Sequence, residues 1–564
     1  MRFTIFAHGS RTGWLVLALL VLLIMLPLAA VVLQVLLPGF FFGSRQIGDL
    51  SLLGEMFRRP LWYLSLKNTL VLGLGTTALG TVLGAALATA RSRWSFPGAR
   101  LLDGAVWLLI VTPSFILAQG WVMFASSDGL AESWFGWHWV HDAVFTPAGL
   151  IAVMSLSKFP FAYLAVYSAL EWKMDRLGEA GRLNGGTAWT VWRTIEAPLL
   201  LPAYCSGALL VFMDTVGDFG LPASIAAVFR FPTLPYSIYS ALYTSPIRFD
   251  MAGVLSFYLV VLIALAMSVQ FWALRRARFD FLGGRATRAK AERPRKGALL
   301  LASGNLLLLA IAVGIPLGAN LLTSVTRPGK SGSSAFTLEH YRELFVEGGQ
   351  LTDALLHSLS IAAFAAIVGL FVGLLVAYVL TYSKFKLKRA IDVISLVSLA
   401  VPGVVLGIGY IFIWNQAWLE RIGLLLYGKP AILVLAGVAG AIPVITRIVT
   451  GAMAKVPQGL LSAAQMQGAS FSRRVRTILL PLLRDALLSA ALAAFGASVF
   501  DLAMTSILFP PNFMTLPVVI NKAFEDLDFG YAAAATLTGG TAVVALILVM
   551  ERIFKPKEAR RPSR

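Results

Sequence analysis

Long apolar stretches separated by short polar connections dominate the pattern of hydrophobic and polar positions along the chain. A helix needs about 20 mostly apolar residues to cross the hydrocarbon core of a bilayer, and about twelve stretches reach that length. They lie at residues 12–37, 63–90, 102–125, 146–171, 199–222, 251–274, 297–325, 353–382, 390–416, 429–454, 480–505 and 530–553. The pattern therefore predicts an all-α polytopic membrane protein with about twelve transmembrane helices.

The first apolar stretch follows Arg2 and Arg11, a position in which a secretory signal peptide also occurs. The apolar core of a signal peptide has only about 7–15 residues, whereas this run has about 24. We therefore expect a retained first transmembrane helix.

The composition excludes an ordinary soluble enzyme, because 58% of the 564 residues are hydrophobic and only 13% are charged. The net charge is +19, and the Lys and Arg residues gather in alternate short loops. The positive-inside rule places those loops, and both chain termini, in the cytoplasm. We interpret the positive charge as a signal of orientation and of contact with membrane lipids, with no nucleic-acid partner. A single cysteine, Cys205, excludes an intrachain disulfide, and we expect no stably bound metal.

The sequence also contains an internal repeat. Equivalent residues lie 289 positions apart in the first part of each copy, as in Pro113 and Pro402, and 283 apart farther on, as in Asp218 and Asp501. Six helices per copy give both copies the same direction, a tandem 6+6 parallel repeat. We expect a first half at residues 1–280, a basic cytoplasmic linker at 281–296 and a second half at 297–564. Further pairs are Asn68 and His357, Thr69 and Ser358, Gly80 and Gly369, Gly84 and Gly373, and Gly120 and Gly409.

The most informative repeat lies in the connections between the fourth and fifth helices of each half. In both loops a glycine follows the first motif position by six residues, an isoleucine by sixteen and a proline by nineteen. The first loop carries Glu179, Ala180, Gly181, Gly185, Ile195 and Pro198, and the second carries Ser462, Ala463, Ala464, Gly468, Ile478 and Pro481. Small residues on a short helix allow another protein to approach closely, and glycine permits a sharp turn. The proline marks the start of the next membrane helix.

This spacing resembles the E-A-A-x-x-x-G-x9-I-x-L-P signature of the permeases of binding-protein-dependent ABC importers. The resemblance covers most of the chain. It implies that both loops dock onto an ABC ATPase dimer on the cytoplasmic side, and that a periplasmic or extracellular substrate-binding protein delivers the substrate. It also implies a location in the bacterial inner membrane.

The chain itself has no G-x-x-x-x-G-K-[ST] motif, so we expect ATP to be bound and hydrolysed on the separate subunit, with no cofactor and no enzymatic activity here. The second loop departs from the family pattern, because Ser462 replaces the usual glutamate. In the family that glutamate anchors the loop to the ATPase by charge. We therefore predict that Glu179→Lys impairs docking more than Ser462→Lys.

Three aspartates are candidate residues of the substrate pathway, since ionisable groups inside membrane spans are costly and often functional. Asp214 and Asp218 lie four residues apart in the fifth apolar stretch, and Asp501 repeats Asp218. Carboxylate oxygens suit a hard cation held transiently. Alternatively, each aspartate caps a broken helix and touches no substrate. Two further aspartates, Asp103 and Asp392, lie beside basic residues at the inner ends of their spans. We expect them to form ion pairs at the membrane interface.

The run Asp218-Phe219-Gly220 resembles one often seen in ferric iron permeases of this family. Fused two-half permeases also serve thiamine, polyamines and phosphonates, so ferric iron is the first of several expected substrates. A secondary transporter of the major facilitator type is the alternative function, because it too has parallel six-helix repeats. The loop at residues 91–100 lacks the Gly-x-x-x-Asp-Arg pattern of that family, which favours the importer. An intramembrane enzyme is disfavoured, because no nucleophile, base or metal set is clustered.

Overall fold

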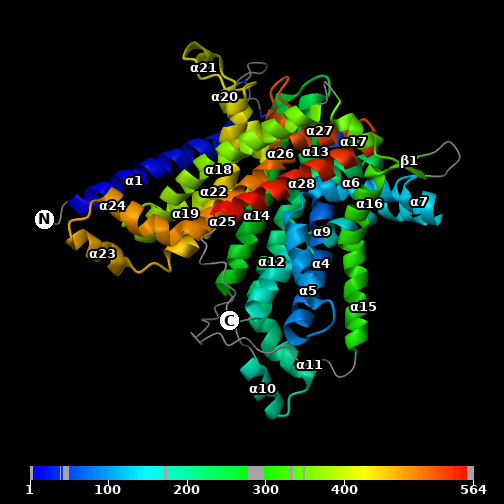
Figure 1. Cartoon of the computed structure of the whole chain (residues 1–564), viewed down its shortest axis with the longest axis horizontal. Coiled ribbons are helices and arrows are strands. Elements are labelled where there is room, and N and C mark those ends of the chain that lie inside the picture. The colour runs from blue at the N-terminus through cyan, green and yellow to red at the C-terminus, as the bar shows by residue number, and fades with distance from the viewer. Residues whose placement is uncertain are drawn as a thin grey trace. The chain divides into compact units, whose positions relative to one another are not determined.

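The structure is a computed structural model that describes residues 4–37, 40, 41, 50–170, 175–276, 297–328, 334–346 and 350–554 (Figure 1). The predicted linker at 281–296 and the basic tail after residue 554 lie outside these ranges. The described residues divide into two compact units, which are treated separately below. The central unit comprises residues 54–244 and 255–337, and the terminal unit comprises residues 1–53, 245–254 and 338–564.

The helices confirm the predicted spans. Within the described ranges, ten continuous helices are long and apolar enough to cross a membrane, and two bent helix pairs bring the number of possible spans to twelve. The bent pairs are the third span of each half, which turn by 105° and 110°. The turns occur at Pro113 and Pro402, where the preceding Thr112 and Val401 are extended. Proline disfavours the helical conformation of the residue before it, so each of these spans breaks.

The central unit is built around three long helices that pack on one another, α4, α9 and α12. A side chain at Gly84 of α4 would lie 2.5 Å from the carbonyl oxygen of Phe159 in α9, so the small residue permits close contact between the helices. The helices of this unit are α3 (Ser51–Arg58, shared with the terminal unit), α4 (Pro60–Arg93), α5 (Ala99–Val111), α6 (Ser114–Ala125), α7 (Leu130–Phe135), α8 (Trp139–Val144), α9 (Pro147–Leu170), α10 (Asp175–Leu183), α11 (Ala188–Val191), η2 (Trp192–Glu196), α12 (Ala197–Gly217), η3 (Pro222–Ala226), α13 (Leu234–Tyr243), α14 (Phe249–Arg276, whose first residues belong to the terminal unit), α15 (Ala298–Leu309), η4 (Ala310–Gly314) and α16 (Ile315–Ser324). Strands β1 (Thr326–Pro328) and β2 (Ser334–Phe336) form an antiparallel pair with Arg327 opposite Ala335.

The terminal unit repeats this core with α18, α22 and α25, which also pack on one another. Gly373 of α18 lies against Ile445 of α22, as Gly84 lies against α9 in the central unit. The helices of this unit are α1 (Thr4–Leu20), η1 (Val21–Met25), α2 (Leu26–Leu36), α17 (Glu339–Leu344), α18 (Gln350–Tyr382), α19 (Lys388–Ala400), α20 (Gly403–Trp414), α21 (Ala417–Arg421), α22 (Pro430–Met453), α23 (Gln458–Met466), α24 (Phe471–Arg474), η5 (Val475–Leu479), α25 (Leu480–Val499), α26 (Leu502–Leu508), α27 (Leu516–Glu525) and α28 (Phe529–Phe554).

Matching hydrogen bonds support the repeat between the two units. In the central unit, the Asn68 side-chain amide donates to the carbonyl of Pro232 at 3.0 Å, and the Thr69 hydroxyl accepts from the backbone N–H of Leu234 at 2.8 Å. In the terminal unit, the Ser358 hydroxyl accepts from the backbone N–H of Leu516, also at 2.8 Å. The predicted pairing of Thr69 with Ser358 therefore corresponds to one structural role, which is to hold the start of α13 or α27.

The first span of each half packs with the helices of the other half. In the terminal unit, α2 contacts α20 and α1 runs beside α18 (Figure 1), whereas in the central unit α16 contacts α6. Both contacts depend on a repeated glycine. A side chain at Gly409 would lie 2.4 Å from the carbonyl oxygen of Pro27, and one at Gly120 would lie 2.0 Å from that of Pro316. The first span of each half therefore belongs to the compact unit that contains most of the other half. We call these two spans the exchanged first spans.

Among the described residues, five short π-helical segments lie within or beside the long helices, and four of them end two residues before a proline. These prolines are Pro27, Pro198, Pro316 and Pro481. Proline lacks an N–H and clashes with the carbonyl four residues earlier, and a wider turn relieves that clash. The four positions form two repeated pairs, so the same irregularities occur in both copies.

Candidate functional site: two repeated loops and a buried charge cluster

The two loops between the fourth and fifth spans have the same sequence of elements at a constant separation of 283 residues. Each begins with a nine-residue helix, α10 or α23. A four-residue helix follows, α11 or α24, and then a five-residue π-helix, η2 or η5. The π-helix leads directly into the next long helix, α12 or α25. Every boundary up to the start of the long helix coincides after the shift, so the sequence repeat is a structural repeat.

Glycine ends the first helix of each loop. Gly185 has φ +82° and Gly468 has φ +79°, a left-handed conformation that glycine adopts without steric cost. The backbone N–H of Gly185 donates to Arg182, and that of Gly468 donates to Gln465, both at 3.0 Å. The turn therefore explains why the repeated motif contains glycine at this position.

The isoleucine of the first loop packs against the motif helix. A side chain at Gly181 would lie 2.9 Å from Cδ1 of Ile195, so Gly181 lets η2 lie close to α10. Pro198 and Pro481 lie two residues after the ends of η2 and η5, whose wider turn accommodates the N–H that proline lacks. The motif thus fixes the fold of the loop through its glycine, isoleucine and proline.

Three of the remaining motif residues face outward. Ala180 and Ala463 are exposed, as is Ser462, whose hydroxyl donates to the Gln458 carbonyl at 3.1 Å. Glu179 lies within α10, but its side chain is outside the described residues. At the last position of each motif helix a large apolar side chain is almost fully exposed, Leu183 at 87% and Met466 at 82%. Each loop therefore presents a small-residue surface beside an apolar side chain, an arrangement that suits contact with another protein.

The candidate pathway aspartates of the central unit belong to a buried charge cluster around Lys158 of α9. The ammonium Nζ of Lys158 lies 2.5 Å from Oδ2 of Asp214 and 2.7 Å from Oδ2 of Asp218. The Ser114 hydroxyl donates to Oδ1 of Asp218 at 2.7 Å. The side chains of Lys158 and Asp218 are only 9% and 3% exposed, whereas that of Asp214 is 37% exposed. Asp214 is thus the accessible member of the cluster.

Asp218 does not lie within the fifth helix, because α12 ends at Gly217 and Asp218 is extended. Its Oδ1 accepts the backbone N–H of Leu221 at 3.3 Å, at the start of the next helical segment. Asp501 has the equivalent position in the terminal unit and accepts the backbone N–H of Met504 at 3.0 Å. Both aspartates therefore cap a helix that follows a break, which agrees with the alternative interpretation of their role.

The charge of Asp218 is compensated in a way that is not repeated at Asp501. The residues 283 positions after Lys158 and Asp214 are Ala441 and Ala497. The residue 289 positions after Ser114 is Gly403. Sequence reasoning missed Lys158, although a lone lysine inside the apolar stretch 146–171 is the kind of signal that identified the aspartates.

Asp103 and Asp392 form the predicted ion pairs, but with partners from other helices than the adjacent Arg100 and Arg389. Asp103 pairs with Arg91 at 2.7 Å, and Asp392 pairs with Arg447 at 2.8 Å.

Across the described ranges, no three His, Cys, Asp or Glu side chains are close enough together to hold a metal ion. The arrangement offers charge compensation, helix capping and docking surfaces.

Comparison with known proteins agrees with these features. The family described as binding-protein-dependent transport system inner membrane component matches the chain twice, at residues 80–278 and 369–560. The chain is 23% identical over 556 residues to a ferric transport system permease protein of Actinobacillus pleuropneumoniae, which covers 95% of this chain and 77% of that protein. It is 24% identical to a putative ferric transport system permease of Haemophilus influenzae, over 76% of this chain and 68% of that protein. It is also 28% identical to a putative 2-aminoethylphosphonate transport system permease of Salmonella typhimurium, over 43% of this chain and 89% of that protein.

Proposed function

The chain belongs to the family of inner membrane components of binding-protein-dependent transport systems, and from this premise we propose that it forms the substrate pathway of an ABC importer and couples to a separate ATPase through its two repeated loops. It is a fused permease with two copies of the family domain and lies in the inner membrane as a multi-pass protein. The family assignment leaves the secondary-transporter alternative without support. Binding-protein-dependent transport also implies a substrate-binding protein as a partner.

The repeated loops are the observation that carries this proposal. An ATPase dimer with twofold symmetry presents the same surface twice, so its partner needs two equivalent docking elements. Helices α10 and α23 are of equal length, end in the same glycine turn and expose Leu183 and Met466 at equivalent positions. Exposed apolar side chains beside polar residues commonly mark surfaces that contact another protein.

ATP chemistry belongs to the partner in this proposal. The sequence contains no phosphate-binding G-x-x-x-x-G-K-[ST] loop, so ATP is bound and hydrolysed on the ATPase dimer and the permease carries no cofactor of its own. The permease contributes mechanical coupling: α10 or α23 passes the movement of the ATPase to α12 or α25 through the short helix and the π-helix that lie between them.

Co-purification with the ATPase tests the coupling. The double variant Leu183→Glu/Met466→Glu places a charge at each exposed apolar position and should abolish recovery of the ATPase with the tagged permease. Leu424→Glu is the matched control. Leu424 is 50% exposed and precedes α22, so it lies at the end of that helix opposite to the second repeated loop. Equal recovery of the ATPase with the double variant and with the control would refute docking through these loops.

Ferric iron is the substrate we propose first, because relatives that cover most of the chain are ferric transport permeases by name. Thiamine, polyamines and phosphonates follow, the last supported by the phosphonate relative. Asp214 is the carboxylate accessible to a cation, while Asp218 is already paired with Lys158. Iron uptake by the Asp218→Asn/Asp501→Asn double variant tests the pathway role. Normal uptake would show that these two aspartates act only as helix caps.

A further inference from the structure

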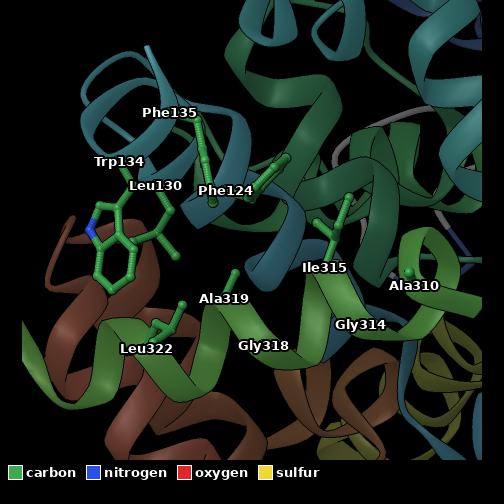
Figure 2. A pocket seen from close by; sticks show the side chains of 10 residues that line it. All are labelled: Phe124, Leu130, Trp134, Phe135, Ala310, Gly314, Ile315, Gly318, Ala319 and Leu322. Carbon is green, nitrogen blue, oxygen red and sulfur yellow. The ribbon is translucent and has the colours of Figure 1, made fainter. Parts of the chain in front are cut away.

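A groove in the central unit has no part in the proposed coupling. It encloses about 300 Å³ between the α6–α7 segment and the η4–α16 segment (Figure 2). Phe124, Trp134 and Phe135 project from one wall, and Gly314 and Gly318 leave space along the opposite wall. Every lining residue is apolar or glycine. The volume is at the lower end of the range of about 300–1,000 Å³ that is usual for small-molecule sites.

Two glycines keep the groove open. A side chain at Gly318 would meet nothing within 4 Å, and one at Gly314 would meet its nearest neighbours only at 3.9 Å. The two residues lie four positions apart, so they share one face of the helix. In the first span of the other half the residues 289 positions earlier are Met25 and Ala29, both larger. The open groove is therefore a feature of one copy of the repeat.

The surroundings of the groove are those of a lipid-facing helix. Helix α16 belongs to the span Ala298–Ser324, and only 17% of its most apolar window is buried within the protein. Leu307 and Leu321 of the same span are 63% and 54% exposed. In an inner-membrane protein, hydrocarbon covers such a face. Water is a poor occupant, because the walls offer it no polar partners.

Aromatic residues next to the groove place it near the end of the span. Trp134 and Phe135 line it, and the rings of Phe135 and Trp137 are stacked with centroids 4.8 Å apart. Trp139 continues this aromatic group at 6.4 Å from Trp137 and is 65% exposed. Tryptophan gathers at the boundary between the hydrocarbon and the headgroups. A phospholipid at this level would extend an acyl chain along α16 while its headgroup stays at the interface.

We propose that the groove is a binding site for one acyl chain of a membrane phospholipid. The acyl chain fills the space left by Gly314 and Gly318 and packs against the aromatic rings of the opposite wall. This contact restores the dispersion interactions that an empty groove lacks. Because α6 also contacts α16, the bound lipid reinforces the attachment of an exchanged first span. This proposal depends on the location of the protein in the membrane and not on the substrate that it transports.

Filling the groove tests the site. Gly318→Leu and Gly314→Met place side chains in the open space, the latter with the residue that the other copy has. Gly304→Leu is the matched control, because Gly304 lies in the same span, also has nothing within 4 Å and is outside the groove. Native mass spectrometry of protein released from phosphatidylglycerol nanodiscs should show one retained lipid fewer in both groove variants than in the wild type and the control. Equal lipid retention in all four proteins would overturn the proposal.

A photo-crosslinking residue at Leu322, on the groove wall, gives a second measurement that does not depend on counting retained lipids. Irradiation in the same nanodiscs should attach phosphatidylglycerol through its acyl chain, and Gly318→Leu should reduce the yield at least fivefold. A crosslink to another polypeptide in place of lipid would show that the groove receives a protein and would contradict the proposal.

Discussion

The helix breaks at Asp218 and Asp501 have the same backbone role but different chemical surroundings. Each aspartate caps the segment that follows the fifth span of its half, through the N–H of Leu221 or Met504. Around Asp218 lie a lysine, a second aspartate and a serine, whereas the repeated positions near Asp501 are alanine, alanine and glycine. Duplication has therefore kept the break and its cap, while the charge compensation is present in one copy.

The two repeated loops, for which we propose the coupling role, also keep their backbone. Their elements coincide in length and position, and their glycine turns have nearly the same φ. The side chains along the loops differ, since Leu183 corresponds to Met466 and Glu179 corresponds to Ser462, so the conservation lies in the backbone of the turn. The comparison of the two copies thus separates backbone features that both copies keep from side-chain contacts that only one copy has.

Removing Lys158 should have the largest effect. Lys158→Ala leaves two carboxylates without their cation, one of them almost fully buried, and breaking a buried ion pair in this way costs about 3–5 kcal/mol. The double variant Lys158→Ala/Asp214→Ala recreates the residues found beside Asp501 and should recover much of that loss. Thermal unfolding of the detergent-solubilised protein measures both. A double variant no more stable than Lys158→Ala would contradict the equivalence of the two breaks.

Neutralising the two capping aspartates should affect the halves unequally. Asp218→Asn weakens charge-assisted contacts with Lys158 and Ser114, which are worth roughly 1.5–3 kcal/mol. Asp501→Asn keeps a capping oxygen and should change stability by at most about 0.5 kcal/mol, since Asn caps as well as Asp. The difference in melting temperature between the variants tests this. A larger loss for Asp501→Asn would mean that Asp501 has a charged partner that the structure does not reveal.

Where the copies agree, matched substitutions should have matched effects. Gly120→Ala and Gly409→Ala both place a methyl group against a proline carbonyl of an exchanged span, and overpacking of this kind costs about 1–3 kcal/mol. Gly104→Ala, which meets nothing within 4 Å on α5, is the control and should be neutral or slightly stabilising. If only one of the two glycines is sensitive, the exchange of first spans is not equally important in both units.

The smallest expected difference concerns the coupling loops themselves. Glu179→Lys reverses a charge at a position where the second loop has Ser462, so it should weaken ATPase binding by roughly 1 kcal/mol more than Ser462→Lys. Titration of the ATPase against each variant in nanodiscs measures this difference. Equal losses would show that the two loops dock with the same electrostatic contribution despite the missing glutamate.

The sequence predicted the spans, the repeat and the positions of both loops because hydropathy and fixed spacing determine those features directly. It did not predict that α2 and α16 exchange units, since apolarity identifies a membrane helix without specifying its neighbours. Pro113 and Pro402 were visible as a repeated pair, yet the breaks they cause fell within stretches interpreted as single spans. Lys158 was not predicted, because a carboxylate alone already suits a cationic substrate, whereas the cluster depends on the lysine between the two aspartates.

Uptake by the reconstituted transporter tests the central claim most directly. The permease, its ATPase and its binding protein are placed in proteoliposomes, and substrate uptake is measured with ATP at the ATPase and, separately, with a proton gradient alone. We predict uptake that requires ATP and is lost in the Leu183→Glu/Met466→Glu variant while Leu424→Glu retains it. Uptake driven by the proton gradient without ATP, or ATP-driven uptake unaffected by the double variant, would contradict coupling through the two loops.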